Sequence, residues 1–345
     1  ELGIGGLERR IGLAAHDLVL AMGAPEVLVT RARRDMSAPT VASRFWLRLQ
    51  AMTGGVPRQA ELAAWAAAVD RPEVVTPARR PAPAPAAALR PRRIAVTAVD
   101  RLLADPFAFY AQAMLRLRKP DPVDADPSAA ERGNAVHDIL ERWLKEDAGD
   151  LALLAARAER MISAWSEHPL LRVLWGPRVR RASEWAAAQL ASDRAAGWRP
   201  VGLESAGEAD LAGITLHGRA DRIDANGGEL GIIDYKTGSA PSHRQLLAGF
   251  ALQLGLLGWL ARDGAFAGVA GEPTRYEYWL LKGGASKVGE VKDPRRLRDK
   301  LPPELEDLAS FAAARFGEAA RRYLLGDEPF VARLHPEYAP WSDYD

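Results

Sequence analysis

The sequence GRADRIDANGGELGIIDYKTG, residues 218–238, decides how the second part of the chain folds. It contains two strand-like runs separated by Asn-Gly-Gly at 226–228, a turn sequence that predicts a β-hairpin. Asp221 lies on the first predicted strand, and Asp234 and Lys236 lie on the second. Because side chains alternate along a strand, Asp234 and Lys236 leave the same face of it. An aspartate inside an apolar strand is costly to bury alone, and a divalent cation would offset that cost.

The residue types in this hairpin suit the hydrolysis of a phosphodiester. Mg2+ takes hard oxygen ligands, usually one or two carboxylates together with waters. When bound, it stabilises the charge of the transition state and lowers the pKa of a water. Lys236 can position that water, help to deprotonate it, or neutralise the phosphate. The two carboxylates keep Lys236 protonated and burial has the opposite effect, so the sequence leaves its charge state open.

Helices are predicted before this hairpin, and a helix and a strand after it. Apolar periodicity predicts helices at about 97–117, from 127 or 128, 151–165, 178–196 and 242–262, and strands at 200–206, 211–223, 230–235 and 276–281. Thr97 and Asp100 predict a capping-box-like start of the first helix, and Asp105-Pro106 predicts a break in it. This order indicates an α+β fold, with a central mixed sheet flanked by helices.

A proline- and alanine-rich stretch separates this part from a smaller first part. Residues 72–93 predict an extended, semi-rigid linker without a packed element, because proline removes backbone donors and disfavours helix in the residue before it. Before it, residues 26–30 (EVLVT) predict a short buried strand and residues 42–52 a helix. The sequence therefore predicts a small α/β piece over 1–71 and a larger domain over 94–345.

Composition excludes several classes of protein. With 48% hydrophobic residues the chain can form a sizeable core, and a formal net charge of +1 means that any basic surface is local. The chain has no cysteine, which excludes disulfides and iron–sulfur clusters and fits a cytoplasmic protein. No apolar run is long enough to span a membrane, and residues 1–3 do not begin a signal peptide, so no membrane association is expected.

The order of four motifs resembles a known family. Asp221 followed by Asp-Tyr-Lys at 234–236 is similar to the signature of PD-(D/E)XK nucleases. GNAVH at 133–137 resembles the G-x-x-x-H helix motif of the RecB-like branch of that superfamily, and Gln253 matches the glutamine of that branch. The resemblance runs from about Ile94 to the end of the chain. It implies a metal-dependent deoxyribonuclease.

The resemblance also implies roles for individual residues. The metal ligands that it implies, for Mg2+ or alternatively Mn2+, are His137, Asp221, Asp234 and the backbone carbonyl of Tyr235. Lys236 would act on the attacking water or the scissile phosphate, and Gln253 would hold the DNA or the geometry of the site. Glu204, on the first predicted strand, is a further candidate acid. Leu-Leu-Gly stands at 256–258 where the family has a tyrosine, so the accessory motif is incomplete.

The first part of the chain has a narrower resemblance. VTRARRDMSAPTVASRFWLRL at 29–49 is similar to the end of the helicase-like α/β domain in AddB, the second subunit of bacterial AddAB helicase–nucleases, in its cysteine-free alphaproteobacterial form. This implies DNA as substrate, an AddA-type helicase–nuclease subunit as partner, and exonuclease action in double-strand break repair by recombination. The chain has no G-x-x-x-x-G-K-[ST] loop, so we do not expect it to hydrolyse ATP.

Two other functions compete with this interpretation. The chain could be a stand-alone nuclease of the RecB or Cas4 type, or a degenerate nuclease fold that serves as a DNA-binding or assembly module. Simpler roles compete for single residues as well. Asp234 and Lys236 could form an ordinary ion pair on a strand. The arginines at 31, 33 and 34 could lie in a solvated loop or contact phosphate.

Overall fold

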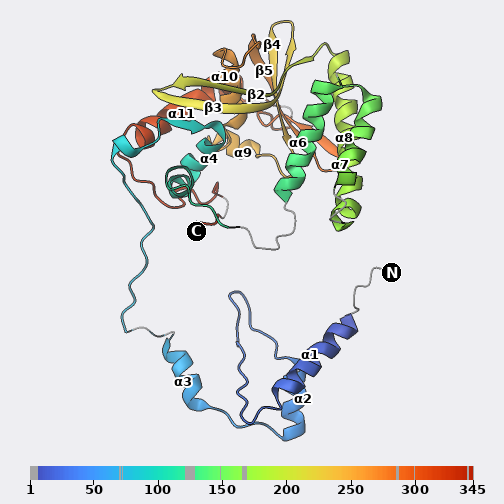
Figure 1. The fold of residues 1–345 in the computed structure, drawn as a ribbon. Coiled ribbons are helices and arrows are strands. Elements are labelled where there is room, and N and C mark those ends of the chain that lie inside the picture. Colours follow the sequence, from blue (N-terminus) through green and yellow to red (C-terminus); the bar gives the residue numbers. More distant parts are fainter. Residues whose placement is uncertain are drawn as a thin grey trace. The chain divides into compact units, whose positions relative to one another are not determined.

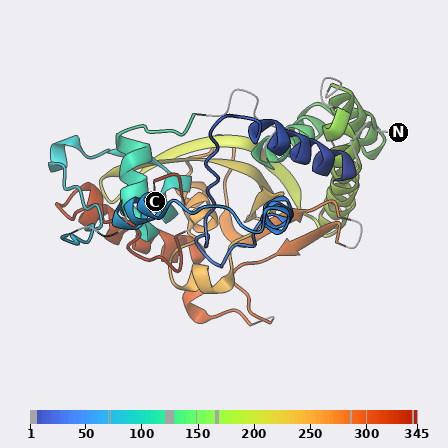
Figure 2. The ribbon, with the colours of Figure 1, turned by 90° about the horizontal axis from the view of Figure 1, so that it is seen from below.

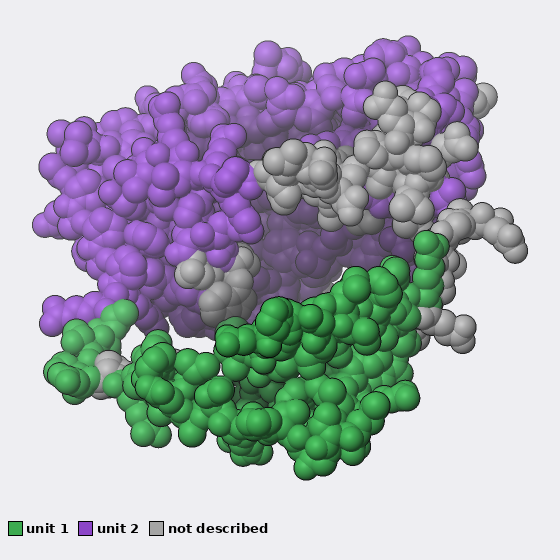
Figure 3. All heavy atoms as spheres, turned by 60° about the horizontal axis from the view of Figure 1, so that its bottom comes forward, with its two compact units in different colours: residues 1–78 green, residues 79–345 purple. Residues whose placement is uncertain are grey.

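The computed structural model of the chain describes residues 7–69, 71, 73–120, 129–147, 149–164, 169–284, 287–298, 300–339 and 342–344. The chain forms two compact units, unit 1 over Glu1–Ala78 and unit 2 over Arg79–Asp345. Figure 1 gives the fold of each unit, and Figure 3 colours the two units separately. We describe each unit by itself.

Unit 1 consists of three helices without a core among its described residues. These are α1 (Leu7–Ala21), α2 (Arg44–Thr53) and α3 (Ala60–Val69). Helix α2 confirms the helix predicted at 42–52, and it ends at Gly54 with φ 66°. The strand predicted at 26–30 is wrong, because residues 27–30 have no regular structure and are exposed. A short apolar run forms a strand only where another strand pairs with it, and the described part of unit 1 offers none.

The first helices of unit 2 follow the prediction closely. They are α4 (Val96–Ala104), α5 (Pro106–Phe109), the π-helical turn Tyr110–Met114, α6 (Ala129–Glu146), α7 (Leu151–Ala164) and α8 (Pro169–Ala195). The predicted break lies at Asp105, whose carboxylate accepts the Ala108 N–H and so caps α5. The capping box predicted at Thr97 and Asp100 is wrong, since α4 begins after Ala95 without a side-chain cap. The Asp100 carboxylate instead accepts a hydrogen bond from the Leu252 N–H, outside α4.

Six strands form one mixed sheet in the part of unit 2 that the structure describes. They are β1 (Arg93–Ala95), β2 (Arg199–Leu211), β3 (Ile214–Asn226), β4 (Glu229–Lys236), β5 (Glu272–Leu281) and β6 (Gly289–Lys292). The predicted hairpin is β3–β4, with positive φ at Gly227 (57°) and Gly228 (95°). Strand β3 starts later than predicted, because Ala212 and Gly213 form the turn from β2. The mixed sheet flanked by helices is confirmed, although β1 and β6 were not predicted.

The two edges of β3 are paired differently, and this opens the sheet beside the hairpin. One edge pairs with β2 along nearly all of its length. On the other edge, residues 215–217 pair with β1 in parallel and residues 222–226 pair with β4 in antiparallel fashion. Residues 218–221 pair with neither strand, so this edge of β3 has a gap between the part that pairs with β1 and the part that pairs with β4. Asp221 lies at the end of this gap.

Helices cover both faces of the sheet and create two hydrophobic clusters. In Figures 1 and 2, α6, α7 and α8 (green) gather at one end of the long curved strands β2 and β3 (yellow). Their cluster includes Ile233 of β4, whereas the neighbouring Ile232 belongs to the other cluster, with α4 and two later helices. Those helices are α10 (Gln253–Arg262) and α11 (Leu308–Ala319). The helix predicted at 242–262 is divided into α9 (His243–Leu247) and α10 by a turn at Gly249 with φ 84°.

The second half of the predicted linker is packed on unit 2. The carbonyls of Pro81 and Pro83 accept the N–H groups of Ala332 and Phe330. Arg90 is 3% exposed, and its guanidinium donates to the carbonyls of Tyr323 and Glu328 at 2.8 Å each. The expectation that 72–93 carries no packed element is therefore wrong for this half. Proline lacks a backbone donor, but its carbonyl still accepts, and that was sufficient here.

Asp105 ties the start of unit 2 to its last part. One carboxylate oxygen accepts both the Ala108 N–H at 3.1 Å and the Arg333 N–H at 3.0 Å. Two backbone bonds lie beside it, from Phe107 N–H to the Val331 carbonyl and from His335 N–H to the Ala104 carbonyl. Segments more than 220 residues apart in sequence are thus joined without a covalent link.

Replacing Asp105 with alanine should destabilise unit 2, because two backbone N–H groups lose their acceptor. We expect the free energy of unfolding in urea to fall by about 2–3 kcal/mol. Asp105→Asn keeps an acceptor oxygen and should lose about 1 kcal/mol or less. Asp138→Ala, which removes an i,i+4 ion pair with Arg142, is the control and should change stability by about 0.5 kcal/mol at most. An Asp105→Ala protein as stable as the parent would contradict this role.

Candidate metal centre

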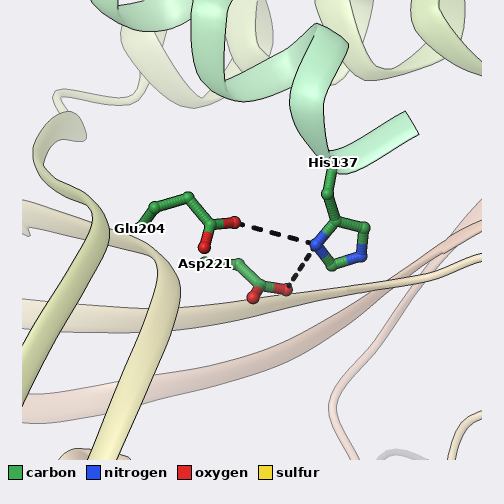
Figure 4. Close-up of side chains that lie close together, drawn as sticks. All are labelled: His137, Glu204 and Asp221. Carbon is green, nitrogen blue, oxygen red and sulfur yellow. Dashed lines mark ion pairs between the residues drawn. The ribbon is translucent and has the colours of Figure 1, made fainter. Parts of the chain in front are cut away.

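His137 reaches the end of the hairpin from α6. Its Nδ1 lies 3.6 Å from Asp221 Oδ2 and 3.8 Å from Glu204 Oε1 (Figure 4). Its Nε2 lies 3.0 Å from the Tyr235 carbonyl oxygen. Gly133, one turn earlier on the same helix face, faces Thr237, and a Cβ there would come within 3.2 Å of the Thr237 hydroxyl. The glycine of the G-x-x-x-H motif therefore lets α6 approach the end of β4.

Asp221 lies where β3 and β4 separate. Their pairing ends at Arg222 and Ile233, so the Tyr235 N–H is beyond the ladder. Asp221 Oδ2 accepts that N–H at 2.8 Å. A carboxylate thus replaces the next backbone acceptor, and it holds Tyr235 with its carbonyl directed to His137.

Asp234 and Lys236 leave β4 on the same side, as the alternation predicts. Lys236 Nζ lies 2.5 Å from Asp234 Oδ2. Gln253, the first residue of α10, donates from Nε2 to Asp234 Oδ1 at 2.6 Å. Both carboxylate oxygens of Asp234, which is 2% exposed, therefore have a polar contact. The Lys236 ammonium also lies 5.6 Å from the centre of the Tyr278 ring.

Burial raises the pKa values of both aspartates, and repulsion adds to the rise at Asp221. The pKa of Asp221 rises to about 7, first because of burial and next because of the charge of Asp234, while His137 opposes the rise. Burial also raises the pKa of Asp234, against the effect of Lys236. Burial lowers the pKa of His137, but Glu204 and both aspartates outweigh it, so the net shift is upward. The site is therefore short of positive charge.

Glu204 takes a larger part in this cluster than the sequence indicated. It lies between Leu203 and Ser205, which pair with Arg222 and Ala220, so it is placed opposite Asp221. Its φ of 46° is in the left-handed region, an unfavourable conformation that recurs at functional sites. Donor atoms of His137, Glu204 and Asp221 all lie within 4.8 Å of one another. In the sequence, Glu204 was only a further candidate acid on the strand predicted at 200–206.

The donor set fits a hard divalent cation. It combines one imidazole with carboxylates, and such ions favour oxygen ligands. The raised pKa of Asp221 is consistent with this, because an added cation would relieve repulsion between the acids. The backbone carbonyl of Tyr235 contacts Nε2 of His137, the ring nitrogen that does not face the acids. The residues that the sequence predicted for the site form two adjacent groups. His137 and Asp221 contact the backbone of Tyr235. Lys236 and Gln253 contact Asp234, the preceding residue of β4, which is not among the three residues whose donor atoms lie within 4.8 Å of one another.

A buried ion network supports the site from the α8 side, and the sequence did not indicate it. Arg222, 1% exposed, donates to Asp193 and Asp224 and to the Tyr235 hydroxyl. Asp224, near the end of β3, is fully buried. The guanidinium also stacks 3.9 Å from the centre of the Trp279 ring. The network fixes the Tyr235 side chain and thereby the backbone next to Asp234.

Comparison with known proteins assigns the chain to a family. A profile of the PD-(D/E)XK nuclease superfamily matches residues 93–326, which is more than half of the chain.

The chain belongs to the PD-(D/E)XK nuclease superfamily.

Its relatives include uncharacterized proteins of three Rickettsia species. The protein of Rickettsia conorii is 27% identical over 178 residues, and that of Rickettsia felis is 28% identical over 178 residues. The protein of Rickettsia bellii is 28% identical over 174 residues. Each match covers 48% of this chain but only 21% of the relative, so the chain spans about a fifth of these proteins.

PD-(D/E)XK nucleases typically use a divalent metal and act on DNA, and this member has no cysteine to hold an iron–sulfur cluster.

Within the described residues, no helix combines the length and the apolar character needed to cross a bilayer. The arginines at 31, 33 and 34 are exposed in unit 1.

Asp221→Asn should stabilise the metal-free protein above neutral pH. Folding raises the pKa of Asp221 from 3.8 to about 7, so its stabilising contribution is complete below pH 3.8 and is lost as the pH rises through 7. Asparagine carries no charge and can still accept the Tyr235 N–H. At pH 8 in EDTA we expect the free energy of unfolding to rise by about 1–3 kcal/mol.

We expect Mn2+ to stabilise the parent against unfolding and the same variant to lose that stabilisation, since it lacks one candidate ligand. Thermal unfolding of both proteins at pH 8, with EDTA and with Mn2+, measures both effects. Asp263→Asn, an exposed change at the far end of α10, is the control and should behave as the parent. A variant that is less stable in EDTA yet keeps the full response to Mn2+ would contradict the electrostatic account.

Proposed function

We propose that the chain is a Mg2+-dependent DNA exonuclease and that it works with an AddA-type helicase–nuclease subunit in the repair of double-strand breaks. One observation carries the catalytic part of this proposal. Side chains from α6, β3 and α10, up to 116 residues apart in sequence, contact two consecutive residues of β4: His137 and Asp221 contact the Tyr235 backbone, and Gln253, with Lys236 of β4 itself, contacts the Asp234 carboxylate. An ordinary ion pair on a strand would not need His137, Asp221 and Gln253 around it.

His137, Asp221, Asp234 and the Tyr235 carbonyl are the proposed ligands of the cation, with Glu204 as an additional acid. When bound, Mg2+ supplies positive charge to the reacting phosphate and lowers the pKa of a water. The Tyr235 N–H holds Asp221 in place, and Gln253 does the same for Asp234. Ligands fixed in this way need little reorganisation when the cation binds.

Lys236 is the proposed residue for the attacking water or the scissile phosphate. Its ammonium contacts Asp234 at 2.5 Å, and its side chain is 28% exposed, so it reaches from the ligands toward solvent. A cavity of about 350 Å³ lies beside Gln253 in the gap between β1 and β4. Thr97, His217 and Arg219 line it as well, which gives a substrate strand polar contacts next to the proposed metal ligands.

The partner and the repair role rest on the resemblance of residues 29–49 to AddB. The size of the relatives is consistent with it, since this chain matches only about a fifth of each. A domain of a large helicase–nuclease subunit would have such relatives. The stand-alone nuclease and the binding module remain the competing functions, and the following experiment separates them.

The chain should cut linear DNA in Mg2+ or Mn2+ and not in EDTA. Asp234→Ala removes a proposed ligand and Lys236→Ala removes the proposed water-positioning group, so we expect each to lower the cleavage rate by about a thousandfold. Labelled duplex and single-stranded substrates, with release of nucleotides followed over time, measure the rate. Asp263→Ala should cut at the rate of the parent.

Two outcomes would change the assignment. If Asp234→Ala and Lys236→Ala cut as fast as the parent, the proposed site is wrong. If the parent binds DNA but cuts none, even with an AddA-type subunit present, the binding and assembly module is favoured. Equal rates with and without that subunit would favour the stand-alone nuclease.

A further inference from the structure

Asp100 has a partner far away in the sequence. It lies on α4, and its Oδ1 accepts the Leu252 N–H at 2.7 Å, 152 residues further on. Leu252 is the N-cap residue of α10, and its own side chain supplies no cap. Helix α10 therefore begins with a backbone donor bonded to a carboxylate from another helix. Negative charge is favourable at this end of a helix.

This contact is one residue away from the candidate metal centre. Gln253, the residue after Leu252, donates its side-chain amide to Asp234 at 2.6 Å. Two hydrogen bonds, Asp100 to Leu252 and Gln253 to Asp234, thus connect α4 with the carboxylate on β4. The four N–H groups at the start of a helix lack partners within the helix, so an external acceptor fixes where its first turn begins.

The charge of Asp100 also faces the site. Burial of the carboxyl raises the pKa of Asp100 to about 6, and the nearby Lys236 ammonium opposes that rise. Lys236 therefore has Asp234 in direct contact and Asp100 as a second acid within electrostatic reach. If Asp100 served only to stabilise α4, its carboxylate would not need to lie within electrostatic reach of Lys236.

We propose that Asp100 is a positioning residue of the nuclease site, which fixes the start of α10 through Leu252 and so holds the Gln253 amide on Asp234. The inference rests on the proposed function, because it assigns Asp100 to the cleavage reaction through Gln253. The operative contact is the hydrogen bond to the Leu252 N–H. A side chain that keeps an acceptor oxygen at this place should therefore keep most of the activity.

Cleavage kinetics of Asp100 and Gln253 variants of the 345-residue chain test this positioning role. We expect Asp100→Ala to lower kcat on linear DNA by about tenfold and to change KM by about twofold at most. Asp100→Asn keeps an acceptor and should stay within about threefold of the parent. The double variant Asp100→Ala with Gln253→Ala should be at most about twofold slower than Gln253→Ala alone, because both changes remove one connected contact. Asp263→Asn is the matched control at the other end of α10.

Hydrogen exchange of the metal-free protein gives a readout that does not depend on activity. In a peptide covering residues 250–256, Asp100→Ala should exchange about tenfold faster at the start of α10, and Asp100→Asn and Asp263→Asn should resemble the parent. Unchanged exchange in Asp100→Ala overturns the inference, whether or not the chain cuts DNA. Faster exchange without any cleavage by the parent would support the contact while the proposed function fails.

Two kinetic outcomes would also overturn it. One is an Asp100→Ala protein that cuts at the rate of the parent. The other is a double variant whose loss equals the product of the two single losses, since independent contacts multiply. An equal loss in Asp100→Asn and Asp100→Ala would likewise contradict the assignment of the Leu252 bond as the operative contact.

Discussion

The repulsion between buried carboxylates is the constraint on which the rest of this site depends. Burial disfavours the charged forms of Asp221 and Asp234, and the charge of Asp234 adds to the cost at Asp221. Several polar groups around them offset part of that cost, whereas Glu204 adds to it at Asp221. His137, Lys236 and Gln253 supply positive charge or N–H donors, and a backbone N–H serves Asp221. The negative charge that they leave uncompensated is what would attract a cation to the proposed site.

The fold creates this arrangement by ending one strand pairing early. A continuous ladder between β3 and β4 would have used the Tyr235 backbone groups within the sheet. Because the strands diverge, the N–H turns to Asp221 and the carbonyl to His137. The Arg222 network below holds the Tyr235 side chain in place, so the divergence is fixed from both sides. Stability and the proposed chemistry therefore share the same few residues.

Local signals in the sequence were sufficient for the hairpin and for the faces of its residues. The glycine turn and the alternation along residues 229–236 depend on neighbours in the chain, so they could be predicted. Three features depend on groups more than 25 residues away, and no local pattern encodes them. They are the burial of Asp224, the partner of Asp100 and the packing of residues 79–93. The strand predicted at 26–30 failed for the related reason that a strand is defined by its partner. The resemblance found His137 and Gln253, which residue types alone could not have distinguished from ordinary core or surface positions.

The tie at Asp105 has a consequence for how unit 2 can be built into a larger protein. Because residues 81–105 lie against residues 323–335, the first segment of this unit and a segment near its end meet at one corner. Other domains can be joined to unit 2 at that corner without distorting its sheet. Forces transmitted along the chain would pass through these hydrogen bonds before they reach the acids on β3 and β4.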